Sequence, residues 1–221
     1  KDFFNVSWDT KLWHLDDIAD GLSRIHKKSI IHRDFHSGNI LIEDNDSKIG
    51  DLGLSKSATE ADDNETYGII PYMAPEVLQG QKYTKASDIY SFGMIMWECM
   101  TGRRPFWDRS HDTELIIDIC DGLRPPTVDI VAPEGYIELM KECWDPDPIK
   151  RPAVGSIYDS IYRIINLEKS NPIVIDRLII IRKIALLMGK RKFDSEGDQN
   201  ENNDKRNKTT NYITKEFEFD I

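Results

Sequence analysis

Cysteine is scarce in this sequence of 221 residues, and that scarcity excludes several classes of protein. The three cysteines, Cys99, Cys120 and Cys143, lie far apart in apolar surroundings. No Cys-x-x-Cys pair occurs, and no histidine is spaced to complete a zinc site with them. An odd, scattered set of this kind is typical of reduced, partly buried thiols. We therefore predict a cytoplasmic protein without disulfides or structural zinc.

Basic residues are also in short supply over most of the chain. The net charge is −10, and residues 1–167 hold 18 Lys and Arg against 29 Asp and Glu. Proteins that bind a nucleic-acid backbone rely on clustered Lys and Arg. Nucleic acid is therefore not an expected partner.

No apolar run is long enough to cross a membrane. The most apolar stretch, Ile173–Met188, is shorter than the roughly 20 residues that a span needs. It is also interrupted by charged residues, namely Asp176, Arg177, Arg182 and Lys183. We predict no membrane span.

The last part of the chain is expected to lie outside the main domain. Residues 168–193 are predicted to form an apolar helical extension that packs against the domain, or else an interfacial or partner-binding helix. Residues 194–211 contain no apolar side chain. Such a composition cannot offset the entropy of ordering, so residues 194–221 are predicted to be a disordered tail.

The rest of the chain shows mostly helical periodicity. Apolar residues at spacings of three and four predict helices, which are listed here: Trp8–Ile25 with Ser7 as N-cap, Ser87–Met100 ended by Gly102, Glu114–Cys120, Tyr136–Cys143 and Val154–Ile165. Ile40–Ile42 and Lys48–Ile49 flank a polar turn and predict a hairpin. The polar stretch Ser55–Thr66 is expected to be an exposed loop. The predicted fold class is α+β, mostly helical, with a small β-hairpin at the active edge.

Three short motifs follow one another through the first third of the chain. They are His32-Arg33-Asp34 with Asn39 five residues later, Asp51-Leu52-Gly53, and Ala74-Pro75-Glu76. The first alone arises by chance on the order of once in 10^5 positions. The order and spacing are those of a protein kinase catalytic half.

These residue types suit the transfer of a phosphoryl group. Such a reaction needs the phosphates held, their charge offset by Mg²⁺, and the acceptor hydroxyl aimed in line. Asp34 can accept the proton of that hydroxyl. Asn39 and Asp51 supply the oxygen atoms that Mg²⁺ prefers.

The stretch from Ser7 to Leu167 resembles the C-terminal lobe of a eukaryotic-type protein kinase, and is closest to the tyrosine-kinase-like group. The resemblance implies a kinase that uses ATP and Mg²⁺ and acts on a protein substrate. It implies that Asp34 is the catalytic base, that Asn39 and Asp51 bind the metal, and that Leu41 floors the adenine ring.

The same resemblance gives roles to residues around the motifs. His32 belongs to the catalytic motif, and Arg33 implies activation by an upstream kinase that phosphorylates the following loop. The candidate acceptors in that loop are Ser55, Ser57, Thr59, Thr66 and Tyr67, of which Thr66 is favoured by position. Two structural roles are also implied. Glu76 would pair with Arg151, and Asp88 would tie the buried helix to the backbone around His32.

Two positions depart from the pattern of serine/threonine kinases. His36 stands where a Lys usually contacts the γ-phosphate, and Ile69 stands where a Thr commonly bonds the catalytic Asp. Both departures leave open whether the acceptor is Ser/Thr or Tyr.

Two alternatives compete with this interpretation. An aminoglycoside or choline phosphotransferase shares the first motif, including His36 and Gly38, but lacks Ala-Pro-Glu and the Ser-Asp-Ile-Tyr-Ser-Phe-Gly helix from Ser87 to Gly93. A pseudokinase or scaffold would keep the fold without turnover. The 221 residues contain neither a glycine-rich loop nor a Val-Ala-Ile-Lys strand, so we expect residues 1–167 to be a partial kinase domain from a fragment that lacks the N-terminal lobe. Such a fragment is expected to be inactive alone.

Overall fold

The computed structural model describes residues 6–43, 46–58, 68–127 and 132–170, which all lie in one compact unit. The predicted tail and most of the predicted extension fall outside these residues. The helices are α1 (Trp8–Lys27), η2 (Ser37–Asn39), η3 (Ile70–Tyr72), α2 (Pro75–Leu78), α3 (Lys85–Thr101), α4 (Thr113–Cys120), α5 (Tyr136–Cys143), η4 (Pro148–Lys150) and α6 (Val154–Ser170). The strands are β1 (Ile30–Ile31), β2 (Ile40–Glu43), β3 (Asp46–Ile49) and β4 (Lys56–Ser57). This part of the chain is therefore rich in helix, as expected, and it has two small sheets where a single hairpin was predicted.

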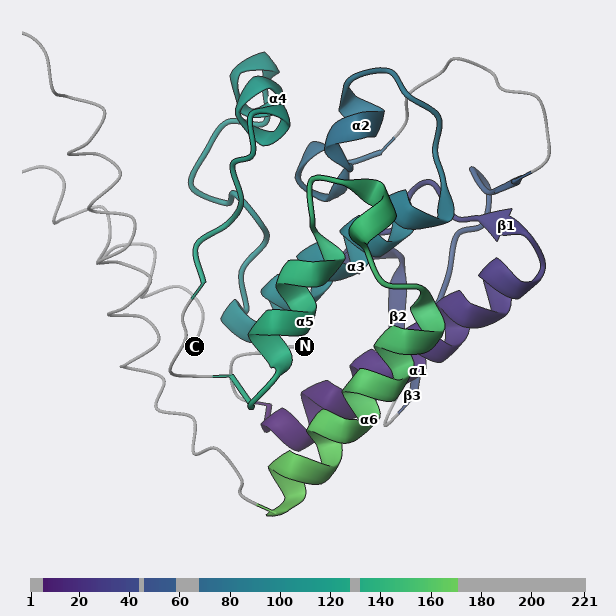
Figure 1. Ribbon diagram of the computed structural model, residues 1–221, viewed down its shortest axis with the longest axis vertical. Coiled ribbons are helices and arrows are strands. Elements are labelled where there is room, and N and C mark those ends of the chain that lie inside the picture. Colours follow the sequence, from purple (N-terminus) through teal and green to yellow (C-terminus); the bar gives the residue numbers. More distant parts are fainter. Residues whose placement is uncertain (1–5, 44–45, 59–67, 128–131, 171–221) are drawn as a thin grey trace, which may run out of the picture. The chain divides into compact units, whose positions relative to one another are not determined.

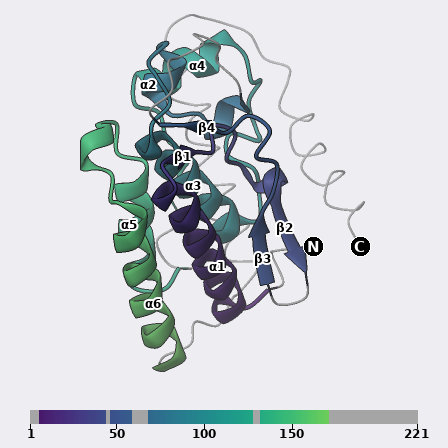
Figure 2. The ribbon, with the colours of Figure 1, turned by 90° about the vertical axis from the view of Figure 1, so that its right-hand side faces the viewer.

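Helix α1 forms where the apolar spacing predicts it. The Ser7 hydroxyl accepts a hydrogen bond from the Thr10 backbone N–H at 3.3 Å, which confirms Ser7 as the N-cap. The helix buries a continuous face that includes Leu12, Leu15 and Ile18. It lies between α6 on one side and the β2–β3 hairpin on the other (Figures 1 and 2).

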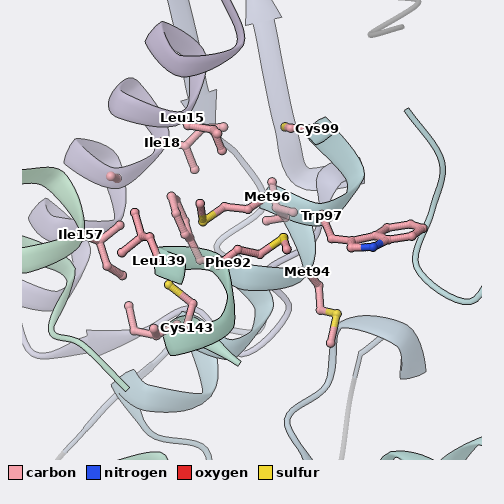
Figure 3. Close-up of a cluster of buried hydrophobic side chains, with 14 of the residues drawn as sticks. Leu15, Ile18, Phe92, Met94, Met96, Trp97, Cys99, Leu139, Cys143 and Ile157 are labelled. Atoms are coloured by element: carbon pink, nitrogen blue, oxygen red, sulfur yellow. The ribbon is translucent and has the colours of Figure 1, made fainter. Parts of the chain in front are cut away.

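Helix α3 is the centre of the core, as its all-round apolar composition predicts. Thr84 and Ser87 form a reciprocal capping box at its start, and Gly102 ends it in the left-handed conformation at φ +67°. Its side chains Phe92 and Met96 point toward residues of α1, α5 and α6 (Figure 3). The elements that carry the motifs are therefore attached to a rigid, buried axis.

The hairpin forms at the predicted place and is fastened to α1. Strands β2 and β3 pair antiparallel. The Ser47 backbone N–H donates to Asp17 at 3.0 Å, and the Ser47 hydroxyl contacts His14 Nδ1 at 2.9 Å. Gly21 on α1 permits this close approach, because a Cβ there would lie 3.3 Å from Ile49.

The prediction of an exposed loop from Ser55 is wrong at its beginning. Lys56 and Ser57 form β4, which pairs antiparallel with Ile30 and Ile31 of β1. The polar composition gave no sign of this strand, because its pairing partner comes from far earlier in the chain. Residues 59–66 of the predicted loop lie outside the described residues.

The helices that follow α3 match the predicted positions to within a few residues. Asp112 caps α4 by accepting hydrogen bonds from the backbone of Glu114 and Leu115. Helix α6 runs to Ser170, past the predicted domain boundary at 167, and Glu168 within it is buried. In the ranges that the structure describes, no helix combines the length and apolar character needed to cross a membrane.

The cysteines are free, as predicted. Cys99 and Cys143 are buried and Cys120 is half-buried. Burial raises the pKa of the Cys99 thiol to about 12, so this thiol stays protonated and unreactive.

Candidate functional site

The loop that carries the first motif is anchored to α3 through Asp88. The carboxylate of Asp88 accepts hydrogen bonds from the backbone N–H of His32 at 2.9 Å and of Arg33 at 3.1 Å. It also lies 2.8 Å from His26 Nε2 at the end of α1. The expected tie between the buried helix and this loop is thus present. It joins three elements at one buried carboxylate.

Asp34 and Asn39 are in direct contact. The Asn39 side-chain amide donates to the Asp34 backbone carbonyl at 2.9 Å and lies 3.4 Å from Asp34 Oδ2. The Asp34 side chain is 18% exposed, so it is held by the protein but open to a reactant. The five-residue spacing in the sequence exists because η2 turns the chain back on itself.

The register of the β2–β3 hairpin brings the backbone next to Asp51 close to Asn39. Ile40 pairs with Ile49, and the Gly50 backbone N–H donates to the Asn39 carbonyl at 2.8 Å. Asp51 is the next residue, exposed and at φ +52°. Its Oδ1 accepts from the Gly53 N–H at 3.2 Å, which turns the chain away from the hairpin.

His32 and Arg33 lie in the interior. His32 is fully buried, and its Nε2 contacts the Gly50 carbonyl oxygen at 3.1 Å, next to Asp51. Arg33 adopts φ +72°, and its guanidinium stacks 4.8 Å from the ring centre of Tyr83. Burial raises the pKa of Tyr83 to about 12, with a smaller lowering by Arg33 and a raising by Asp34. The side chains of His32 and Arg33 therefore support the loop from its buried side.

Leu41, unlike the buried His32 and Arg33, has its side chain on the surface. It is 55% exposed on β2, which is high for a leucine, while Ile40 on the same strand packs against the core. Gly50 lies beneath it, and a Cβ there would be 3.5 Å from Leu41 Cδ1. An apolar platform thus stands next to Asn39.

The segment from Gly68 to Ala74 borders Asp34 from the other side. A Cβ on Gly68, which adopts φ +125°, would lie 3.6 Å from Asp34 Oδ1. The Tyr72 hydroxyl donates to the carboxylate of Glu98 and lies 3.2 Å from the Ser37 hydroxyl. Burial and the Glu98 charge raise the pKa of Tyr72, so it remains a donor. Sequence reasoning did not select Gly68 or Tyr72, and only the glycine in a polar loop could have been a signal.

The end of this segment is held by an ion pair. Arg151 donates to both carboxylate oxygens of Glu76 at 2.7 Å, and both side chains are buried. The predicted pairing of these residues is confirmed. It connects α2 with the loop that follows η4.

Among the described residues, no group of three His, Cys, Asp or Glu side chains could hold a metal ion. Asn39 and Asp51 instead offer one amide and one carboxylate. Magnesium is commonly bound by one or two carboxylates together with substrate phosphates. The donor set fits a metal that arrives with a nucleotide.

Comparison with known proteins identifies the family. Residues 4–161 match the family described as protein tyrosine and serine/threonine kinase. The chain therefore belongs to the protein kinase family. Its intact motifs place it with the eukaryotic-type, tyrosine-kinase-like members.

Individual relatives include both serine/threonine and tyrosine kinase types. The putative serine/threonine-protein kinase/receptor R818 of Acanthamoeba polyphaga mimivirus is 34% identical over 74% of this chain and 10% of its own length. The probable serine/threonine-protein kinase drkB of Dictyostelium discoideum is 34% identical over 67% of this chain and 22% of its own. Ephrin type-B receptor 4b of Danio rerio is 36% identical over 68% of this chain and 16% of its own length. The chain thus spans about a tenth to a fifth of these relatives.

Proposed function

We propose that residues 1–167 are the C-terminal lobe of a protein kinase that transfers the γ-phosphoryl group of ATP to a protein hydroxyl. Membership of the family supports ATP and a protein as the reactants. The observation that supports the proposal is the contact between Asp34 and Asn39, together with the backbone hydrogen bond from Gly50, the neighbour of Asp51, to Asn39. A phosphoryl transfer needs these groups together.

Asp34 is the base in this proposal. Its carboxylate is accessible enough to receive a proton from a bound hydroxyl. Asn39 holds the backbone of Asp34 with its amide nitrogen, which fixes where that carboxylate stands. Aiming the hydroxyl is a larger part of the reaction than the proton transfer itself.

Asn39 and Asp51 are the proposed ligands of Mg²⁺. The amide nitrogen of Asn39 points at Asp34, so its oxygen is the atom available to a cation. Asp51 Oδ1 accepts one backbone hydrogen bond and keeps further lone pairs. When Mg²⁺ is bound, it offsets the charge of the phosphates.

Leu41, His32 and Arg33 have supporting roles in the proposal. The exposed Leu41 would be covered by the adenine ring. The buried His32 and Arg33 position the loop, and the charge of Arg33 suits a regulatory phosphate introduced by an upstream kinase. Of the candidate acceptors for that phosphate, Ser55 and Ser57 are half-buried, and the others lie outside the described residues.

The test is phosphoryl transfer by the full-length protein that contains these residues. Radiolabelled ATP and peptide libraries with Ser, Thr or Tyr as acceptor would reveal activity and acceptor type together. Asp34→Asn and Asp51→Asn are each expected to lower the turnover at least 100-fold. Asp20→Asn, on the exposed surface of α1, is the matched control and should leave turnover unchanged.

Unchanged turnover in Asp34→Asn would refute the role of the base. Binding of Mg-ATP by the unsubstituted protein without any transfer would instead support the pseudokinase or scaffold alternative.

A further inference from the structure

We propose that His36 is a positioning residue that orients the carboxylate of Asp34, and that Gly38 is glycine so that the His36 ring can do this. The inference rests on the proposed function, because it assigns the partner of the base. It replaces the expectation that position 36 merely departs from a Lys.

The His36 ring is held in a defined place. Its Nδ1 accepts a hydrogen bond from the Gly38 backbone N–H at 3.0 Å. Its Nε2 lies 3.5 Å from Asp34 Oδ2. The ring stands 5.9 Å from that of Tyr72, and its side chain is only 12% exposed.

The contact with Gly38 fixes which nitrogen carries the hydrogen. A nitrogen that accepts a hydrogen bond must keep its lone pair, so the neutral ring carries its hydrogen on Nε2. Nε2 is the atom that faces Asp34. With its hydrogen on Nε2, His36 can donate to the carboxylate once the 3.5 Å separation shortens, as contacts in catalytic sites do when the substrate binds.

The glycine at position 38 is explained by space. A Cβ there would lie 2.7 Å from His36 Cε1 and 2.8 Å from Nδ1, closer than real contacts allow. Gly38 is not among the described residues with positive φ, so its backbone conformation does not require glycine. The space taken by the His36 ring is the reason for glycine at position 38.

The two donors on Asp34 approach the same oxygen. His36 Nε2 and the Asn39 amide both lie near Oδ2, at 3.5 and 3.4 Å. The other oxygen, Oδ1, lies on the side of Gly68. Asp34 is thereby oriented with one oxygen toward its supports. The second oxygen is left for a hydroxyl that arrives along the Gly68 segment.

The test is a double-mutant cycle in the full-length protein, with turnover at saturating ATP and peptide as the readout. His36→Ala is expected to lower kcat about tenfold with little change in KM, because a misplaced base slows the chemical step. Gly38→Ala should have a similar effect, since it displaces the ring. The combined variant should be no slower than His36→Ala alone. His111→Ala, an exposed histidine before α4, is the control and should leave kcat unchanged.

Costs that add in the combined variant would mean that Gly38 acts on the backbone independently of the ring, and would overturn the inference. An unchanged kcat in His36→Ala would also overturn the inference. If Asp34→Asn then still showed a large loss of kcat under the same conditions, the proposed function would remain intact.

A second readout does not depend on activity. Nitrogen-15 NMR of the imidazole rings in the 221-residue chain distinguishes the two neutral forms. His36 is expected to carry its hydrogen on Nε2, and Gly38→Ala should change its signals more than those of the other four histidines. A hydrogen on Nδ1 would contradict the proposed geometry.

Discussion

A buried carboxylate can stabilise or destabilise the folded state of this domain, depending on whether hydrogen-bond donors surround it. Asp88 is buried and accepts hydrogen bonds from two backbone N–H groups. Asp16 on α1 is also buried, but its Oδ1 has no hydrogen-bond partner among the described residues. Burial, together with the charges of Asp17 and Asp20, raises the pKa of Asp16 from 3.8 to about 6. Asp16 therefore destabilises the folded state when it is charged.

This shift makes stability depend on pH in a defined direction. Below about pH 4 the carboxyl is protonated in both states and costs nothing; the folded state loses stability as pH rises from about 4 to 6, and the loss is complete above. Asp16→Asn should raise the free energy of unfolding at pH 7 by on the order of 1–3 kcal/mol. Urea unfolding at pH 4.5 and pH 7 measures both effects.

Glu43→Gln is the control for this prediction, because Glu43 is not among the groups that shift the pKa of Asp16. Glu43 is exposed and paired with Lys48 at 2.7 Å, so its removal should not stabilise the protein at pH 7. A slope between pH 4 and 6 that persists in Asp16→Asn would show that another group is responsible.

At the scale of the elements, close packing of α3 against α5 depends on a missing side chain. A Cβ on Gly93 would lie 3.0 Å from Cys143 Cβ and 3.2 Å from the Met140 carbonyl oxygen. Backbone atoms cannot move aside as a flexible side chain can. Gly93→Ala should therefore lower the free energy of unfolding by about 1–3 kcal/mol.

Gly155 provides a matched comparison in α6. Nothing lies within 4 Å of a Cβ built there, so Gly155→Ala should be neutral or stabilise the helix by a few tenths of a kcal/mol. Thermal unfolding of Gly93→Ala and Gly155→Ala measures the two changes in stability. Equal changes in the two would mean that helix propensity, rather than the α3–α5 contact, governs the result.

At the scale of the whole domain, Arg151 links segments that are distant in sequence. Besides Glu76, it donates to the backbone carbonyls of Ala86 and Asp145. Its removal leaves the Glu76 carboxylate buried without its cation. Arg151→Ala is expected to cost about 3–5 kcal/mol, measured by urea unfolding.

The exposed pair formed by Arg24 and Asp20 is the control for Arg151. Arg24→Ala should change stability by no more than about 0.5 kcal/mol, because water screens the pair. Similar losses in the two variants would argue that the buried pair is not what joins the segments.

The sequence by itself was enough to predict the helices α1, α3, α4, α5 and α6, and it singled out the candidate site residues. Local rules suffice for a helix such as α1, since its capping serine and its apolar spacing lie within the helix itself. The spacing of Asp34 and Asn39 likewise carries its meaning within six residues. The hairpin was also predictable, because its strands adjoin a polar turn.

Only the tertiary structure decided features whose partners are remote in sequence. The pairing of β4 with β1, the placement of Gly68 beside Asp34 and the contact of Tyr72 with Glu98 each join residues more than 20 positions apart. A linear pattern carries no signal for these contacts, because they depend on how α3 orients the loops around it. The need for glycine at position 38 also emerged only from the folded chain, where the His36 ring occupies the space of its missing side chain.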